Sequence, residues 1–148
     1  MKSEQTILLV EDNDDDAELT ERAFREAKIA NPIVRATDGV AALDYLFGRG
    51  GYEGRRVTET PAVVLLDLNL PRLGGLEVLA EIRANDQTKT MPVVVLTSSA
   101  DDRDRLTAYH HQANSYVQKP VDYDHFVEAA RQLGLYWTVL NMPPKDRL

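Results

Sequence analysis

Five polar side chains that could do chemistry stand at the ends of short apolar runs. Glu11 and Asp12 follow the first run, Asp67 follows the third, Thr97 the fourth and Lys119 the fifth. Three carboxylates held a few ångströms apart repel one another, so the pKa of at least one must rise unless a cation lies between them. If the fold brings these run ends together, the residue types predict a divalent metal site.

The ligand types also indicate which ion would bind. Carboxylates, a backbone carbonyl and water are all oxygen ligands, and these suit Mg²⁺, which often shares its shell with a phosphate. Ca²⁺ fits less well, because the ligand spacing of an EF-hand loop is absent. Thr97 and Lys119 opposite the metal would hold the remaining oxygens of a phosphoryl group on a carboxylate. These residues predict an aspartyl phosphate site, where positioning and charge neutralisation supply most of the catalysis.

The elements that must position these side chains alternate along the chain. Apolar runs rich in β-branched residues occupy 6–10, 33–36, 62–66, 92–96 and 115–117. A helical pattern follows each run, and unbroken runs of Val, Ile and Leu are typical of strands buried on both faces. The pattern predicts an α/β fold of five βα units, a doubly wound parallel sheet with helices on both sides. Ligands of such sheets bind beyond the carboxyl ends of the strands.

Length and composition limit the class of protein. The 148 residues suit a single domain over 1–148, with its core in 6–140 and a C-terminal tail at 141–148. The absence of cysteine excludes disulfides and thiolate chemistry. A net charge of −7 without a basic run argues against nucleic-acid binding, and no apolar stretch approaches the roughly 18 residues that span a membrane. We expect a cytoplasmic protein.

Acidic residues outside the predicted site are expected to serve helix starts. Asp38, Asp101 and Asp122 each precede a helical pattern and can cap its N-terminus. We assign residues 14–16, three consecutive aspartates, to helix capping and solvent, because negative charge is favourable at a helix N-terminus.

The last helix carries a long apolar stripe. Its members repeat at steps of four, three, four and three, and they are Phe126, Ala130, Leu133, Trp137 and Leu140. Together with apolar residues close to the C-terminus they exceed what a small core readily covers. We therefore expect a homodimer through the face made by the fourth helix, the fifth strand and the fifth helix. The connection 48–60, which contains four glycines, is expected to be a surface loop.

Five motifs in order make residues 6 to about 140 resemble the receiver domains of response regulators. They are LLVED at 8–12, LLDLNLP at 65–71 with Gly74 and Gly75, VLTS at 95–98, Tyr116, and Lys119 with Pro120. Each motif alone is weak, but the ordered set at strand ends is specific. The resemblance implies a flavodoxin-like fold with strand order 2-1-3-4-5.

The resemblance also implies a role for each residue of the site. Asp67 would be the phosphoacceptor, and Mg²⁺, for which Mn²⁺ can substitute, would be held by Asp67, by Asp12 directly, by Glu11 through water and by the backbone carbonyl of Asn69. Thr97 and Lys119 would contact the phosphoryl oxygens, and Tyr116 would turn inward as the Thr97 hydroxyl moves. The Lys119–Pro120 bond would be cis, which aims the ammonium into the site. Glu11 stands where many receivers have aspartate.

The implied function is a switch, not a turnover enzyme. A sensor histidine kinase would donate the phosphoryl group, water would later remove it, and the output would be altered partner binding. The long loop before the third strand and the extended last helix resemble stand-alone regulators paired with bacterial phytochrome kinases.

Three other functions are weaker interpretations of the same residues. An aspartyl-phosphate phosphatase commonly has an acid two residues after its nucleophile, where this chain has Asn69. A flavodoxin-like cofactor binder needs a loop after the first strand that cradles phosphate, and the loop here is acidic. A scaffold receiver without phosphorylation would not need every chemical position, yet all of them are present.

Overall fold

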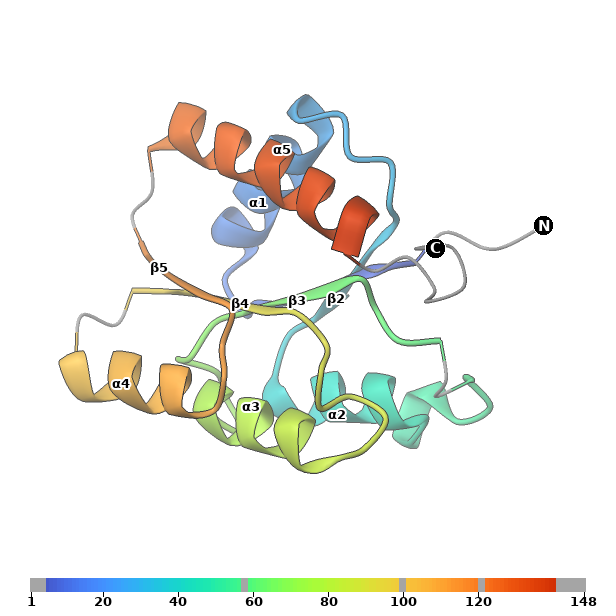
Figure 1. Ribbon diagram of the computed structural model, residues 1–148. Coiled ribbons are helices and arrows are strands. Elements are labelled where there is room, and N and C mark those ends of the chain that lie inside the picture. The colour runs from blue at the N-terminus through green and yellow to red at the C-terminus, as the bar shows by residue number, and fades with distance from the viewer. Residues whose placement is uncertain (1–4, 57–58, 99–100, 120–121, 141–148) are drawn as a thin grey trace.

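The structure, a computed structural model, places a five-stranded sheet between two layers of helices (Figure 1). It describes residues 5–56, 59–98, 101–119 and 122–140, with only the backbone described for residue 102 and residues 133–140. The strands are β1 (Ile7–Val10), β2 (Ile33–Ala36), β3 (Val63–Leu66), β4 (Val93–Thr97) and β5 (Ser115–Gln118). The helices are α1 (Asp14–Glu26), α2 (Gly39–Phe47), α3 (Gly75–Ala84), α4 (Asp102–His110) and α5 (Tyr123–Leu140), with the 3₁₀ turn η1 (Gly50–Tyr52).

The strand order is β2-β1-β3-β4-β5 and all neighbours are parallel, which confirms the predicted doubly wound sheet. Each strand lies within one residue of its predicted bounds. Val10, the last residue of β1, pairs with Leu66, the last residue of β3. Glu11 and Asp67 directly follow these paired strand ends and are therefore held side by side. Thr97 is the last residue of β4, one position beyond the predicted strand end.

The unbroken apolar strands are explained by a core on each face of the sheet. Leu8 and Val10 pack with α2, α3 and α4 on one face, while Ile7 and Leu9 pack with α1 and α5 on the other. Successive strand side chains point to opposite faces, so a strand covered on both sides needs an apolar residue at every position. All four side chains are at most 1% exposed. The sheet is a rigid base for the loops at its carboxyl edge.

The helices begin largely where the acidic residues predict. The three predicted caps are confirmed: Asp38 accepts a hydrogen bond from the backbone N–H of Ala41, Asp101 from that of Arg103 and Asp122 from that of His125. The N-cap of α1 is Asn13, whose side chain accepts from the backbone N–H of Asp16 at 2.9 Å. The three aspartates 14–16 therefore form the first turn of α1, not its cap.

The loop after α2 is tied to the body of the protein. Gly48 ends α2 in the left-handed conformation, with φ at 64°, as glycine commonly does at a helix C-terminus. Further along, the Arg55 guanidinium lies 4.0 Å from the centre of the Tyr45 ring and donates to the Tyr45 carbonyl at 2.9 Å. The predicted surface loop is thus folded back on α2.

The first half of α5 follows the predicted apolar stripe. Phe126 and Ala130 are buried, and the Phe126 ring meets the Phe24 ring of α1 edge to face at 6.3 Å. The side chains of Leu133, Trp137 and Leu140, and the predicted tail 141–148, lie outside the described residues. In the part of the chain that the structure describes, neither α5 nor any other helix is long and apolar enough to cross a membrane.

Gly75 lets α3 approach the backbone that carries Asp67. A Cβ added at Gly75 would lie 2.3 Å from the carbonyl oxygen of Asp67 and 2.6 Å from the Cα of Leu68. At the preceding Gly74 the nearest heavy atom to such a Cβ is 4.0 Å away. Residue 75 must therefore lack a side chain if α3 is to pack here, whereas residue 74 need not.

We predict that Gly75→Ala lowers the free energy of unfolding by roughly 2 kcal/mol, because the added methyl group forces α3 away from the backbone of Asp67 and Leu68 at the end of β3. Gly74→Ala makes the same chemical change one residue earlier and should alter the free energy of unfolding by less than about 0.5 kcal/mol. Urea unfolding of both variants beside the unsubstituted protein measures the difference. Equal losses in the two variants would contradict this reading of the contact.

Candidate functional site

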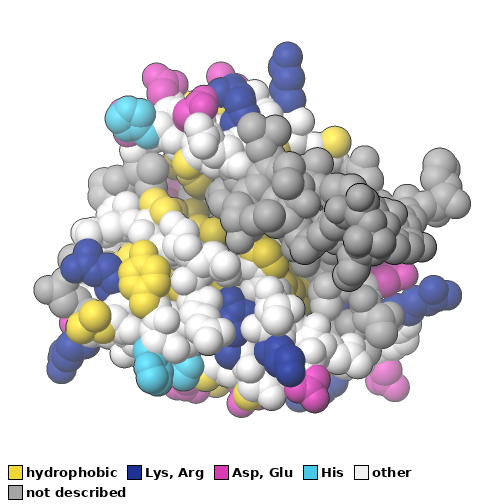
Figure 2. All heavy atoms as spheres, in the orientation of Figure 1, with side chains coloured by type: hydrophobic (Ala, Val, Ile, Leu, Met, Phe, Trp, Pro, Cys, Tyr) yellow, Lys and Arg dark blue, Asp and Glu magenta, His cyan; other side chains and the backbone are white. Residues whose placement is uncertain are grey.

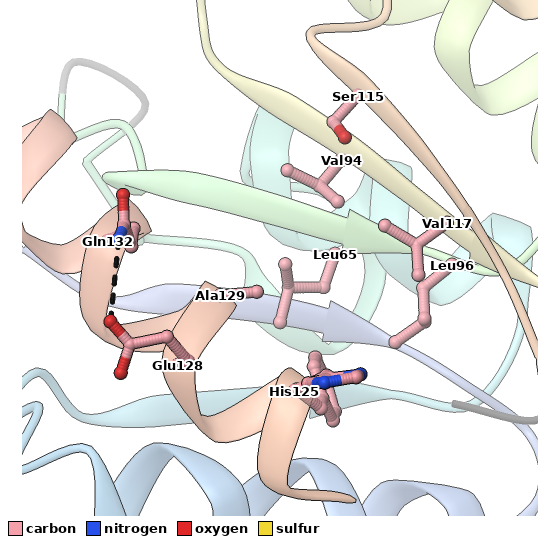
Figure 3. A pocket seen from close by; sticks show the side chains of 10 residues that line it. Leu65, Val94, Leu96, Ser115, Val117, His125, Glu128, Ala129 and Gln132 are labelled. Carbon is pink, nitrogen blue, oxygen red and sulfur yellow. Dashed lines mark hydrogen bonds between the residues drawn. The ribbon is translucent and has the colours of Figure 1, made fainter. Parts of the chain in front are cut away.

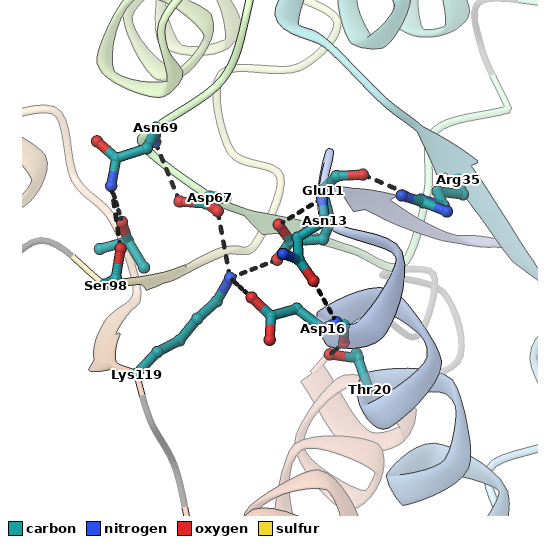
Figure 4. Close-up of polar contacts among 10 residues, drawn as sticks. Glu11, Asn13, Asp16, Thr20, Arg35, Asp67, Asn69, Ser98 and Lys119 are labelled. Atoms are coloured by element: carbon teal, nitrogen blue, oxygen red, sulfur yellow. Dashed lines mark hydrogen bonds and ion pairs between the residues drawn. The ribbon is translucent and has the colours of Figure 1, made fainter.

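The residues predicted from the strand ends meet at one edge of the sheet, and Figure 4 shows Glu11, Asp67 and Lys119 among them. Carboxylate oxygens of Glu11, Asp12 and Asp67 lie within 4.8 Å of one another. Thr97 is fully buried at the end of β4, and the side chain of Lys119 reaches from the end of β5 toward the carboxylates. The structure thus brings all five together, as the sequence predicted.

The ammonium of Lys119 contacts three carboxylates. Its Nζ lies 2.6 Å from Oε1 of Glu11, 2.9 Å from Oδ2 of Asp16 and 3.2 Å from Oδ2 of Asp67. An ammonium has three N–H donors, so each donor has one carboxylate as its acceptor. The side chain of Lys119 is only 13% exposed, which leaves these contacts poorly screened by water. Lys119 therefore supplies the positive charge that lets the acidic residues stand so close together.

The assignment of Asp16 to capping and solvent was wrong. Asp16 lies in the first turn of α1, one turn before the buried Thr20, whose hydroxyl donates to the Asp16 carbonyl at 3.0 Å. Residues i and i+4 share a helix face, so Asp16 points to the same inner side and reaches Lys119. The spacing to Thr20 was the signal in the sequence that would have found it. Asp14 and Asp15 are exposed, as expected.

Glu11 has a carboxyl group that holds its proton unusually strongly. Its side chain is 1% exposed, and burial raises its pKa most. The hydrogen bond from Lys119 lowers the pKa and the nearby charge of Asp67 raises it, so the pKa of Glu11 is about 7. Among the three possible metal ligands, Glu11 is therefore the carboxyl group whose ionisation is most opposed by burial.

The pKa of Asp67 is shifted in the opposite direction. Burial raises its pKa, but the Asn69 backbone N–H, the Lys119 ammonium and the Thr97 hydroxyl outweigh burial, so the pKa of Asp67 is below its ordinary value. Burial likewise lowers the pKa of Lys119, but hydrogen bonds to Glu11 and Asp16 outweigh it and raise that pKa above its usual range. Asp67 is consequently an ionised carboxylate facing a charged ammonium, as a nucleophile requires.

Asn69 connects the end of β3 to the end of β4. Its backbone N–H donates to Oδ1 of Asp67 at 3.0 Å. Its side-chain Nδ2 donates to the hydroxyls of Ser98 at 3.2 Å and Thr97 at 3.4 Å. These side-chain contacts, and Ser98 as a site residue, were not predicted from the sequence. Metal ligation by the Asn69 carbonyl stays a prediction.

Arg35 of β2 is a further residue beside the site that was not predicted from the sequence. Its Nε donates to the backbone carbonyl of Glu11 at 3.0 Å, and its Nη1 lies 2.9 Å from Oδ1 of Asp14. Nη2 is buried and has no hydrogen-bond partner among the described residues. A lone charge inside an otherwise apolar strand was the available signal. Arg35 secures the loop between β1 and α1 that carries the acidic residues.

The predicted switch residue Tyr116 lies on β5, half-buried against the core beneath α4. Its ring centre is 6.5 Å from that of Tyr109 on α4, at a tilt of 41°. The role of Tyr116 in switching stays a prediction. Pro120, and with it the predicted cis bond to Lys119, lies outside the described residues.

The donor set fits a divalent ion of the magnesium type. Glu11, Asp12 and Asp67 offer carboxylate oxygens alone, and Asp12 is exposed, which leaves room for the waters that Mg²⁺ keeps. The pKa of Glu11, raised first by burial and further by the charge of Asp67, also fits, because a cation bound to the Glu11 carboxylate would favour its ionised form. These three residues are the ones that would hold Mg²⁺ or Mn²⁺.

Comparisons with known proteins agree with this geometry. A family model described as the response regulator receiver domain matches residues 7–131. The chain is 42% identical over 139 residues to the "Probable methanogenesis regulatory protein FilR2" of Methanothrix harundinacea, which covers 93% of this chain and 86% of that protein. It is 35% identical over 133 residues to the response regulator Rcp1 of Synechocystis, covering 90% and 88% of the two chains.

Solved structures give the same result at the level of the fold. The Mn²⁺-bound form of Rcp1 superposes with a TM-score of 0.80 at 34% identity, covering 95% of this chain and 99% of that one. The bacteriophytochrome response regulator RtBRR superposes with a TM-score of 0.79 at 45% identity, covering 96% and 85%. The flavodoxin-like fold is thus confirmed.

The pKa of Glu11 sets the sign of a pH effect on stability. Its pKa in the folded protein, about 7, exceeds the ordinary value of 4.5, so Glu11 adds stability that is complete below pH 4.5 and lost as the pH rises through about 7. The lowered pKa of Asp67 adds stability that is present above its ordinary value of 3.8, and the raised pKa of Lys119 adds stability present below 10.5. The stability contributions of Asp67 and Lys119 therefore stay constant between pH 3.8 and pH 10.5.

We therefore predict that Glu11→Gln removes a pH-dependent part of the stability of the metal-free protein. In buffer with a chelator, the free energy of unfolding of the unsubstituted protein minus that of Glu11→Gln should fall by on the order of 2 kcal/mol between about pH 5 and pH 8. Urea unfolding at several pH values measures it. A difference that stays constant across this range would show that Glu11 does not titrate there.

Proposed function

The chain belongs to the response regulator receiver family, and we propose that it is a Mg²⁺-dependent switch that accepts a phosphoryl group on Asp67 from a histidine kinase. One observation carries the proposal: Oδ2 of Asp67 lies 3.2 Å from the ammonium of Lys119, inside a group of carboxylates whose oxygens are within 4.8 Å of one another. Nucleophile, cation and metal ligands are assembled before any phosphoryl group arrives. Such prior positioning is most of what phosphoryl transfer needs.

The contacts of Asp67 assign its two oxygens different tasks. Oδ1 is held by the backbone N–H of Asn69, so Oδ2, which faces Lys119, is the oxygen that attacks the phosphorus. The new O–P bond forms as the P–N bond to the donor histidine breaks, and the imidazole leaves with the bonding electron pair. Lys119 and Thr97 donate hydrogen bonds to the phosphoryl oxygens. A bound Mg²⁺ would neutralise charge on the carboxylates and on the phosphoryl group.

Switching would begin at Thr97. Its hydroxyl now accepts from Asn69 Nδ2 at a long 3.4 Å, a contact that is easily exchanged for a phosphoryl oxygen. β4 pairs with β5 along its length, with Val95 opposite Tyr116, so a shift at the end of β4 is passed to the tyrosine. Phosphorylation then favours a different arrangement of β4, α4 and β5, which partners distinguish.

The alternative functions receive less support. A phosphatase acid would stand at Asn69, but an amide cannot supply a proton, and its Nδ2 is engaged with the hydroxyls of Ser98 and Thr97. A scaffold that is never phosphorylated would not need Lys119 aimed at Asp67. We therefore propose a phosphoacceptor that turns over only its own phosphoryl group.

For the kinase partner we propose a histidine kinase of the bacterial phytochrome class. The support is the likeness to RtBRR, a bacteriophytochrome response regulator that shares 45% of its residues and nearly the whole fold with this chain. Partners are discriminated by the contacts that their surfaces make, and chains this similar in sequence and fold present similar surfaces.

For a second partner we propose another copy of the chain, bound through α4, β5 and α5. Hydrophobic side chains gather on this face in Figure 2, over α4 and along a hollow beside α5. Leu106 and Tyr109 of α4 are 68% and 49% exposed. The hollow is a groove of about 670 Å³ between α5 and the sheet; its apolar lining includes Leu65, Val94, Leu96, Val117 and Phe126 (Figure 3). Apolar surface of this kind commonly marks an interface.

We predict that Leu106→Glu weakens the dimer at least about tenfold, because it places a charge in the centre of the proposed interface. Ala30→Glu puts the same side chain on the exposed connection between α1 and β2 and should leave association unchanged. Sedimentation velocity over a range of concentrations measures both. A protein that sediments as a monomer throughout, or equal effects of the two substitutions, would contradict the proposed face.

We predict that Asp67→Asn abolishes incorporation of a phosphoryl group, from acetyl phosphate or from a phosphorylated phytochrome-class kinase, with a loss of at least about 100-fold. Asp15→Asn removes an exposed carboxylate nearby and should be labelled like the unsubstituted protein. A chelator should stop labelling of the unsubstituted protein and of Asp15→Asn. Phosphate-affinity electrophoresis and mass spectrometry measure the product, and undiminished labelling of Asp67→Asn would refute the acceptor assignment.

A further inference from the structure

Asp16 differs from the other carboxylates that contact Lys119. Glu11 and Asp67 also belong to the group whose oxygens lie within 4.8 Å of one another and could share a metal ion. Asp16 does not belong to that group, yet its Oδ2 lies 2.9 Å from the Lys119 ammonium (Figure 4). It is therefore the one contact of the Lys119 ammonium, among the described residues, that a metal ion in the acidic pocket would leave intact.

Asp16 is held in place from both sides of its backbone. Its N–H donates to the side chain of Asn13 at 2.9 Å, and its carbonyl accepts from the hydroxyl of Thr20 at 3.0 Å. Both bonds lie within α1 and its N-cap, so they keep the first turn helical, with Asp16 on the side of α1 that reaches Lys119. The carboxylate is thus presented to Lys119 from a fixed position, and its side chain is 60% shielded from water, being 40% exposed.

Metal binding must change the partners of Lys119. A divalent ion between Glu11 and Asp67 repels an ammonium that lies 2.6 Å and 3.2 Å from the same two carboxylates. Lys119 must then loosen these two contacts while staying close enough to meet a phosphoryl oxygen. A third carboxylate outside the metal group keeps the ammonium beside Asp67 during this exchange.

We propose that Asp16 is a positioning residue for Lys119, which draws the ammonium off Glu11 and Asp67 when the metal ion binds and keeps it at the mouth of the acceptor site. The proposal rests on the proposed function, because it deepens the account of the same site. Without Asp16, the remaining acceptors of the Lys119 ammonium among the described residues are Glu11 and Asp67, so the ammonium competes with the ion for these two carboxylates. Removing the Asp16 carboxylate therefore weakens Mg²⁺ binding.

The test compares Asp16→Asn with Asp15→Asn. Both substitutions remove one negative charge from the first turn of α1, but the side chain of Asp15 has no hydrogen bond or ion pair with any residue that the structure describes. Isothermal titration of Mg²⁺ into each protein at constant pH and ionic strength gives the dissociation constants. Asp16→Asn should raise the dissociation constant roughly fivefold more than Asp15→Asn does, the scale of a partly exposed ion pair. Circular dichroism checks that both variants are folded.

A second pair of measurements identifies Lys119 as the route of the effect. In proteins that also carry Lys119→Met, no ammonium competes with Mg²⁺, so Asp16→Asn and Asp15→Asn should raise the dissociation constant equally. If Asp16→Asn remains the more harmful there, Asp16 acts on the hydrated ion itself and the proposal is overturned. Equal effects of the two substitutions in the presence of Lys119 would overturn it as well.

The outcomes also separate this inference from the function on which it rests. If the unsubstituted protein does not bind Mg²⁺ at millimolar concentrations, the proposed metal-dependent function fails, and the inference fails with it. If the unsubstituted protein binds Mg²⁺ and Asp16→Asn behaves like Asp15→Asn, the inference alone fails.

Discussion

The ammonium of Lys119 is the contact on which the site depends. It joins four parts of the chain, since Lys119 follows β5 while its three carboxylate partners come from the ends of β1 and β3 and from α1. Carboxylates this close would otherwise repel one another, and one ammonium carries less positive charge than the three carboxylates that it contacts carry negative charge. The site is poised for a second cation because its negative charge is incompletely balanced.

The close placement of these carboxylates requires a rigid sheet. β1 and β3 lie in the middle of the sheet with apolar cores on both faces, so Glu11 and Asp67 cannot move apart to relieve their repulsion. Gly75 adds a further constraint by letting α3 pack against the backbone of Asp67. Burial energy from the core thus holds charges in a geometry that they would not adopt alone, and the proposed phosphoryl transfer would use this prior positioning.

The parts of the site differ in how freely they can move. Glu11 and Asp67 stand at the ends of central strands, whereas Thr97 ends β4 next to the edge strand β5, and α4 beyond it exposes Leu106 and Tyr109. The part of the site on the central strands β1 and β3 is thereby connected through β4 to the edge strand β5 and to α4, where side chains can rearrange. The apolar groove is lined in part by β4 and β5, so the proposed partner surface lies next to the elements that would switch.

Much of the fold and site could be predicted from the sequence, for identifiable reasons. Strands buried on both faces must be apolar at every position, so runs such as the one ending at Val10 were unmistakable. Parallel strands bring their carboxyl ends to one edge, so Glu11, Asp67 and Lys119 were expected to meet, and they do. The strand order came from the resemblance to receivers, because apolar runs alone do not say which strands are neighbours.

What only the tertiary structure decided is which side chains complete the site. Asp16 looked like one of three equivalent aspartates until the rotation of α1 against the sheet turned it, and neither of its neighbours, toward Lys119. Arg35 looked like an interruption in a strand until β2, distant in the sequence, lay beside the loop after β1. Residue type and local period determine elements and their ends, but a contact between elements depends on how they are rotated and spaced when the core packs.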